Sequence, residues 1–332
     1  MTLGDLAALS ATEIVALVKA RQISPVEVVK ASLDRIERCN PTLNAVVTLN
    51  EQAIEDAIAL EASIKSSSDT HVLCGVPVGI KDLTPVAGLR TTYGSPIFSD
   101  HIPTEDAIIV QRLRSEGAII VGKTNTPEFG AGASTFNEVF GRTRNPWNPE
   151  RTSGGSTGGG AAALASGMIG IAEGSDLGGS LRIPASFCGL VGLRPSPGLV
   201  PTHPTEWLWD ELSVNGPMAR TAEDVALALK VMAGSDPRSP RSQSIQGRDF
   251  SSGIERSRLM DFVSGTVLTW LGWESSGDRG SMPLCCWGLE TGGADIEQIE
   301  VDLSEARKAF SPAWSVDGHA YARSYGSYRR TW

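Results

Sequence analysis

Two serines in glycine-rich surroundings are the candidate nucleophiles of this chain. Ser156 lies in the run Ser153–Gly160, and Ser180 follows 24 residues later in Gly174–Pro184. One position in three from 151 to 180 is glycine, and Ala161–Ser166 has the composition of a helix. The pattern predicts a glycine turn that leads into a helix N-terminus, where free backbone N–H groups can bind a polarised oxygen. A flexible linker is the alternative interpretation of Ser153–Gly160.

A serine hydroxyl needs a base before it can attack a carbonyl. Four histidines are present, none of them in a setting typical of a serine–histidine–aspartate triad: His71, His101, His203 and His319. Lysine is the remaining type of base, and Lys81 ends an apolar run that begins at Gly75. Burial in a strand can lower the pKa of such a lysine. A structural ion pair with Asp82 is the other interpretation of Lys81.

The elements around these residues alternate between helix and strand. Two capping-box patterns, Ser10–Glu13 and Ser24–Glu27, predict helices in the first sixty residues, the second with proline at its first position. Apolar runs and capping residues then predict strands at 75–81, 118–121 and 168–172, and helices at 104–116 and 222–233. This order predicts a layered α/β domain.

Charge and composition argue against several classes of protein. The net charge is −9, and no run of basic residues is present, so nucleic acid is not expected as a partner. The most apolar stretch, Gly160–Ala172, is shorter than the roughly 20 residues of a membrane span, and the N-terminus has no signal pattern. We therefore expect a cytoplasmic protein without membrane contact. Five cysteines without CxxC spacing predict neither a disulfide framework nor a zinc site.

Several motifs occur together and in one order. They are Gly79–Asp82, Gly122–Phe129, Gly141–Trp147, Ser153–Gly159, Gly174–Pro184, Phe187–Pro195 and Gly216–Thr221. In combination they resemble the amidase signature family of hydrolases, from about residue 5 to about residue 240. The resemblance implies an α/β/α sandwich with a mixed central sheet covered by helices, plus an N-terminal helical region.

The resemblance also implies a Ser-cisSer-Lys triad for amide hydrolysis. Ser180 would be the acyl nucleophile, Ser156 the bridging serine after a cis peptide, and Lys81 the base. The oxyanion hole would be formed by backbone N–H groups of Leu177, Gly178, Gly179 and Ser180. The supporting residues would be Asp176 and Arg182, which orient the loop, and Thr157, which stands where many members have a second serine.

Three regions are expected along the chain: an N-terminal helical layer of the same domain at 1–65, the catalytic core at 66–250, and a divergent, incomplete part at 251–332. Between about 256 and 292 the periodicity is lost, and we hypothesise two compensating frame shifts there. A small-molecule amide is the expected substrate, with no metal or organic cofactor and with a homodimer as a possible assembly. The alternatives are the glutaminase (A) component of a tRNA-dependent amidotransferase and an inactive amidase fragment.

Overall fold

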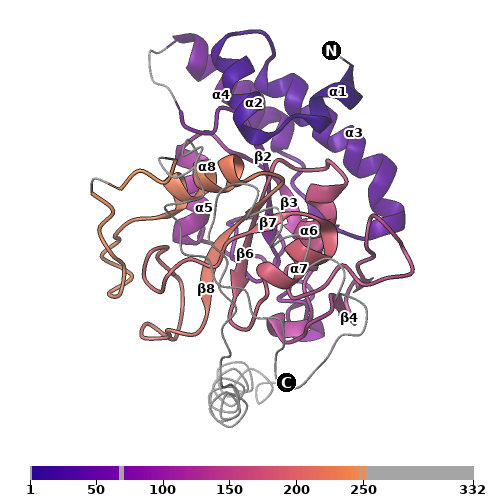
Figure 1. The fold of residues 1–332 in the computed structure, drawn as a ribbon, viewed down its shortest axis with the longest axis vertical. Coiled ribbons are helices and arrows are strands. Elements are labelled where there is room, and N and C mark those ends of the chain that lie inside the picture. The colour runs from indigo at the N-terminus through magenta and orange to yellow at the C-terminus, as the bar shows by residue number, and fades with distance from the viewer. Residues whose placement is uncertain (1, 67–70, 247, 252–332) are drawn as a thin grey trace, which may run out of the picture. The chain divides into compact units, whose positions relative to one another are not determined.

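A computed structural model describes residues 2–66, 71–246 and 248–251 (Figure 1). Met1–Ser251 forms one compact unit. The hypothesis of frame shifts at 256–292, and the prediction for 251–332 beyond its first residue, lie outside the described residues.

A mixed sheet of six strands forms the centre of the unit. In spatial order the strands are β1 (Val46–Leu49), β3 (Ile119–Thr124), β2 (Pro77–Lys81), β6 (Ile171–Asp176), β8 (Val214–Ala219) and β7 (Val191–Gly192). The three strands β3, β2 and β6 run parallel, whereas β1, β8 and β7 pair antiparallel with their neighbours. Two short strands, β4 (Phe136–Asn137) and β5 (Gly141–Arg142), pair separately.

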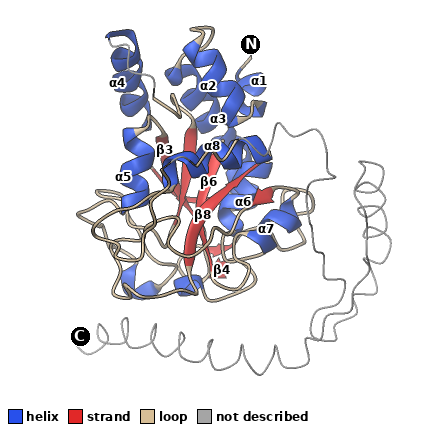
Figure 2. Cartoon of the chain, turned by 60° about the vertical axis from the view of Figure 1, so that its left-hand side comes forward, coloured by secondary structure: helices blue, strands red, loops and turns tan. Residues whose placement is uncertain are grey.

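Helices cover both faces of this sheet, because successive side chains of a strand point to opposite sides. Ile120 packs in one apolar cluster, while its neighbours Ile119 and Val121 pack in the other. The first cluster includes side chains from α1 (Leu3–Ala8), α2 (Ala11–Lys19), α5 (Ile108–Ser115) and α8 (Ala222–Met232). The second includes side chains from α3 (Pro25–Leu43), which also contributes to the first, and from α4 (Ala53–Ser66), α6 (Gly158–Ala165) and α7 (Arg182–Cys188). Figure 2 shows α5 and α6 on opposite sides of the strands. The expected α/β/α architecture is confirmed.

The helix starts follow the predicted capping signals. Ser10 and Ser24 each accept the N–H of the glutamate three residues later, and each glutamate accepts the N–H of its serine. Thr221 caps α8 in the same way through the N–H of Asp224. None of the helices in the described part of the chain is long and apolar enough to cross a bilayer.

Element boundaries and three strands of the central sheet differ from the sequence-based prediction. The helix expected from residue 104 begins at Ile108, and the strand expected at 168–172 occupies Ile171–Asp176. The strands β1, β7 and β8 have no counterpart among the predicted elements. β8 contains Gly216 and Pro217, which disfavour a strand by local propensity, so only its pairing with β6 and β7 defines it.

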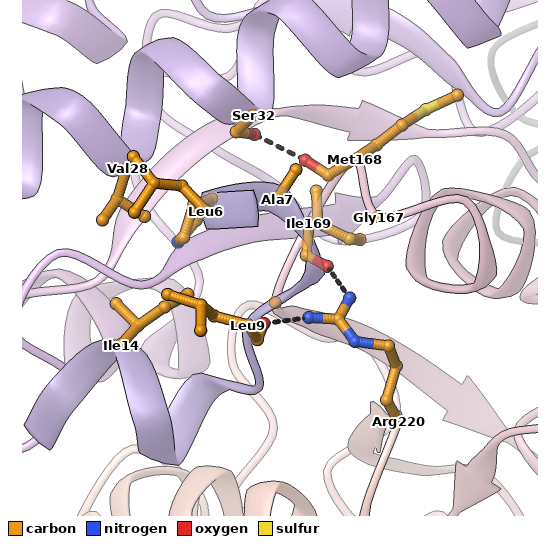
Figure 3. Close-up of a pocket in the computed structure, with 12 residues that line it drawn as sticks. Leu6, Ala7, Leu9, Ile14, Val28, Ser32, Gly167, Met168, Ile169 and Arg220 are labelled. Atoms are coloured by element: carbon orange, nitrogen blue, oxygen red, sulfur yellow. Dashed lines mark hydrogen bonds between the residues drawn. The ribbon is translucent and has the colours of Figure 1, made fainter. Parts of the chain in front are cut away.

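Arg220 connects the N-terminal helices to the sheet. Its guanidinium donates to the carbonyl of Leu9, which separates α1 from α2, and to the carbonyl of Ile169 at 2.9 Å, just before β6 (Figure 3). Ser32 of α3 donates to the neighbouring carbonyl of Met168. Two side chains therefore hold the segment that enters β6 against α1 and α3.

Candidate active site

The candidate site lies where two parallel strands end side by side. Lys81 is the last residue of β2, and Asp176 is the last residue of β6. The register pairs Ile80 with Glu173, so the lysine and the end of β6 reach the same edge of the sheet. The carboxyl ends of parallel strands are a common place for ligand sites in α/β folds.

Lys81 is fully buried and faces two serine hydroxyls. Its Nζ lies 2.7 Å from Ser156 Oγ and 3.0 Å from Ser175 Oγ. Burial lowers the pKa of Lys81 to about 7, although the negative charges of Glu173 and Asp176 act in the opposite direction. A lysine in this state changes charge near neutral pH and can exchange a proton with a hydroxyl in contact with it.

A backbone hydrogen bond brings the segment of Ser156 next to that of Ser180. The peptide between Gly155 and Ser156 is cis, as the family resemblance implies. The next residue, Thr157, donates its N–H to the carbonyl of Ser180 at 3.2 Å. Its hydroxyl donates to the carbonyl of Ser175, at the longer distance of 3.4 Å. The structure therefore brings Lys81 and Ser156 into direct contact and places the backbone of Ser180 next to them.

Asp176 organises the loop that carries Ser180. Its buried carboxylate accepts the N–H of Gly179 at 2.8 Å and of Leu181 at 3.1 Å, and Arg182 donates to both of its oxygens at 3.0 Å. Burial alone would raise the pKa of Asp176, but the hydrogen bonds from Arg182, Gly179 and Leu181 outweigh it and lower that pKa. Asp176 and Arg182 together therefore hold the loop between β6 and α7.

One of the expected oxyanion donors is already engaged. The N–H of Gly179 donates to the carboxylate of Asp176, whereas the family resemblance implies that it faces the substrate. Gly179 has a φ of +112°, and a Cβ there would lie 2.7 Å from the side chain of Ile183. Leu177, Gly178 and Ser180 stand on the same turn between β6 and α7.

The glycine run bends at Gly155–Thr157 and leads into a helix, as predicted, although Gly158–Gly160 already belong to that helix. A flexible linker is excluded. Helix α6 begins at Gly158 and is buried over Gly158–Leu164. A Cβ on Gly159 would lie 2.2 Å from the backbone nitrogen of Asn125, and one on Gly158 would lie 2.4 Å from the hydroxyl of Thr135. Close packing against neighbouring segments, rather than access for a substrate, explains these glycines.

The alternative of an ion pair between Lys81 and Asp82 finds no support in the contacts of these residues. Asp82 accepts hydrogen bonds from the N–H and hydroxyl of Thr92, and its Oδ1 lies 3.6 Å from Nζ of Lys123. Lys123 is fully buried and also donates to the carbonyl of Thr84 at 2.6 Å. Lys81 instead points to the serines.

Three buried or partly buried residues of this region are absent from the sequence-based prediction of the site: Lys123, Glu173 and Ser175. Lys123 and Ser175 both lie within motifs that carry the family resemblance. Glu173 interrupts an apolar stretch next to Gly174, and a charge at a position where a buried strand is expected is the available signal.

A comparison with protein families matches residues 27–260 to the model described as Amidase. The chain belongs to the amidase signature family. The A subunit of glutamyl-tRNA(Gln) amidotransferase from Carboxydothermus hydrogenoformans is 47% identical over 75% of this chain and 51% of its own length. An acylamidase of Rhodococcus erythropolis is 43% identical over 81% of this chain and 56% of its own length.

Solved structures of the family share the fold. A bacterial aryl acylamidase superposes with a TM-score of 0.72 at 39% identity, over 75% of this chain and 52% of that one. The peptide amidase of Stenotrophomonas maltophilia superposes with a TM-score of 0.79 at 27% identity, over 90% and 63%. This amidase-family chain spans about half the length of the curated relatives it matches.

Proposed function

We propose that the chain carries the catalytic machinery of an amidase, which hydrolyses a carboxylic amide to an acid and ammonia or an amine through an acyl-enzyme on Ser180. The observation that carries the proposal is the 2.7 Å contact between Nζ of the buried Lys81 and Oγ of Ser156. The contact between the backbone of Thr157 and Ser180 supports it, because it sets the second serine beside the first.

The proton moves along one line of groups. The neutral amine of Lys81 takes the proton of Ser156, and Ser156 takes that of Ser180 as Ser180 Oγ bonds to the amide carbon. When the C–N bond breaks, the proton returns through Ser156 to the leaving nitrogen. Water then attacks the ester by the same route, which releases the acid and restores Ser180. These three side chains together complete the path of the proton.

The oxyanion of the tetrahedral intermediate needs backbone donors that are already in place. In this proposal Leu177, Gly178 and Ser180 supply them, and Asp176 with Arg182 holds the turn on which they lie. Because Gly179 donates to Asp176, we assign its N–H to the support of the turn.

Labelling with a fluorophosphonate tests the proposal without knowledge of the substrate. The reagent should modify Ser180 in the full chain, Ser180→Ala should abolish labelling, and Lys81→Ala should reduce it by at least about a hundredfold. The matched control is Ser186→Ala, which removes an exposed serine of α7 and should leave labelling unchanged. Full labelling of Ser180→Ala would exclude Ser180 as the nucleophile.

Two forms of this function are compatible with the site: a stand-alone amidase and a glutaminase subunit of an amidotransferase. The relatives named acylamidase favour a stand-alone amidase, as do the sequences of the motifs Gly88–Thr92 and Trp207–Pro217. The 47% identity to the A subunit of an amidotransferase favours a glutaminase that works with partner proteins. A glutaminase assay with and without such partners distinguishes them: activity that depends on the partners supports the second version. A homodimer and a cytoplasmic location stay predictions.

A further inference from the structure

Another buried carboxylate, that of Glu173, lies beside Lys81, and the reaction proposed above does not use it. Glu173 has no exposed surface and stands in β6 opposite Ile80. Its Oε2 accepts the backbone N–H of Lys81 at 3.2 Å, and its Oε1 accepts the hydroxyl of Thr84 at 3.0 Å. The carboxylate thus holds the chain on both sides of Asp82, directly at the base of the lysine side chain.

The other carboxylates near Lys81 have cationic partners of their own. Asp82 faces Lys123 at 3.6 Å, and Asp176 pairs with Arg182 at 3.0 Å and with Arg194 at 3.6 Å. Glu173 interacts electrostatically with both buried lysines, Lys81 and Lys123. Among the described residues, Glu173 is therefore the carboxylate whose negative charge raises the pKa of Lys81 most, ahead of Asp176.

The helices packed on β2 add no further charge at the lysine. Helix α6 has none in its sequence, Gly158–Ala165. Helix α3 turns apolar side chains such as Val29 and Ile36 to the sheet, and its ionisable residues lie at least partly in solvent. The charges that act on Lys81 are therefore those of Glu173 and Asp176 of β6. Asp82, which follows β2, and Lys123 of β3 face each other at 3.6 Å.

We propose that Glu173 is a positioning residue that sets the pH at which Lys81 becomes an active base, through its negative charge and its hold on the lysine backbone. Burial raises the pKa of Glu173, whereas the hydroxyl of Thr84 and the charges of Lys81 and Lys123 favour its charged form. The inference rests on the proposed role of Lys81. Burial lowers the pKa of Lys81, and the charge of Glu173 raises it. The balance keeps the lysine charged in acid and neutral just above pH 7, so the carboxylate delays the onset of activity.

The test is the pH dependence of the rate at which a fluorophosphonate labels Ser180 in the full chain, from about pH 5 to about pH 9. Glu173→Gln removes the charge but can keep both hydrogen bonds, because its carbonyl accepts the N–H of Lys81 and its amide donates to Thr84. We expect the midpoint of the rise to move to lower pH by about one unit. Glu173→Asp retains the charge and should keep the midpoint close to that of the wild type.

A matched control and a second variant complete the test. Asp224→Asn neutralises another fully buried carboxylate, which accepts hydrogen bonds from Thr12 at the start of α2, and should leave the midpoint unchanged. Thr84→Val removes the hydroxyl that stabilises the charge of Glu173, and should move the midpoint in the same direction by a smaller amount. If Glu173→Gln does not fold, the midpoint of Thr84→Val tests the inference in its place.

Two failures are distinguishable. If the wild-type chain is not labelled at Ser180, the proposed function itself is wrong. If the wild type is labelled and the midpoint is the same in Glu173→Gln, or in Thr84→Val where that variant stands in, the carboxylate does not tune Lys81 and this inference is overturned.

Discussion

Burial of a single amine determines the pH range in which this site can work. In water, lysine is charged at neutral pH, but Lys81 is surrounded by protein on all sides, and its Nζ donates to the uncharged hydroxyls of Ser156 and Ser175. Its pKa falls to about 7 because the charged form loses its hydration. Desolvation therefore makes the amine available as a base near neutral pH, and protonation below this pKa removes it.

We expect amide hydrolysis to rise with pH across this pKa. Below a pKa of about 7 the neutral fraction of Lys81 falls about tenfold for each pH unit, and the rate should fall with it. The measurement is kcat/KM for a chromogenic anilide or a similar amide against pH, with circular dichroism at each pH to confirm the fold. A rate that is constant, or that increases toward acid, contradicts the assignment of Lys81 as the base.

The glycines of α6 let the segment that carries Ser156 pack close to the rest of the core. At Gly159 a Cβ would meet Asn125 N at 2.2 Å and the carbonyl oxygen of Ala45 at 2.8 Å. Both neighbours are backbone atoms, which cannot rotate away as a side chain could. The position of α6, and with it that of Ser156 just before the helix, depends on this absence of a side chain.

Gly159→Ala should therefore destabilise the chain by about 3 kcal/mol, at the upper end of the range for overpacking. Chemical denaturation with a helix signal measures the change. Gly4→Ala is the control, because a Cβ at Gly4 in α1 approaches only Thr2, at 3.7 Å, and alanine is the better helix former. Equal stability of the two variants would contradict this expectation, because it would show that the backbone around α6 moves to accommodate a Cβ.

The elements that local chemistry determines are predictable from the sequence, and those determined by pairing are not. Capping boxes at Ser10 and Ser24 act within one turn of helix, so the sequence alone reveals them. β6 continues through Glu173, which is buried because Thr84 and two lysines distant in sequence satisfy it. No local pattern carries that information, so the prediction places this strand too early and misses β8.

The candidate site shows the same division. Lys81 at the end of a buried strand is predictable from its neighbours in sequence, whereas the roles expected for Ser156 and Ser180 come from the family resemblance. Glu173 and Lys123 escape the sequence-based prediction because a charged residue in an apolar stretch has no evident partner until the sheet order β3-β2-β6 is known.

The N-terminal helices depend on a few polar contacts with the core as well as on apolar packing. Arg220 is partly buried and donates to carbonyls on two sides of one junction, at Leu9 and at Ile169. Without it, those carbonyls lose a charged donor, which costs more than the loss of an exposed contact.

Arg220→Met should lower the free energy of unfolding by about 2 to 3 kcal/mol. It should also increase amide hydrogen exchange in α1 and α2 more than in the strands of the sheet. The control is Arg38→Met, which breaks an exposed ion pair with Asp34 and should cost less than about 0.5 kcal/mol. Uniform exchange across the described unit in Arg220→Met would argue against a local role for the arginine.

The strand order also separates the parts of the site in time. In the proposed mechanism the base ends β2, the bridging Ser156 lies 75 residues further along the chain, and the nucleophile follows β6. Translation at roughly 5–20 residues per second leaves an interval of roughly 5 to 20 s between synthesis of Lys81 and of Ser180. In the first part of that interval β2 and β3 can already pair while Ser156 and Ser180 are still to be made. In the proposed mechanism a ribosome-bound chain therefore cannot react until β6 and Ser180 have been added.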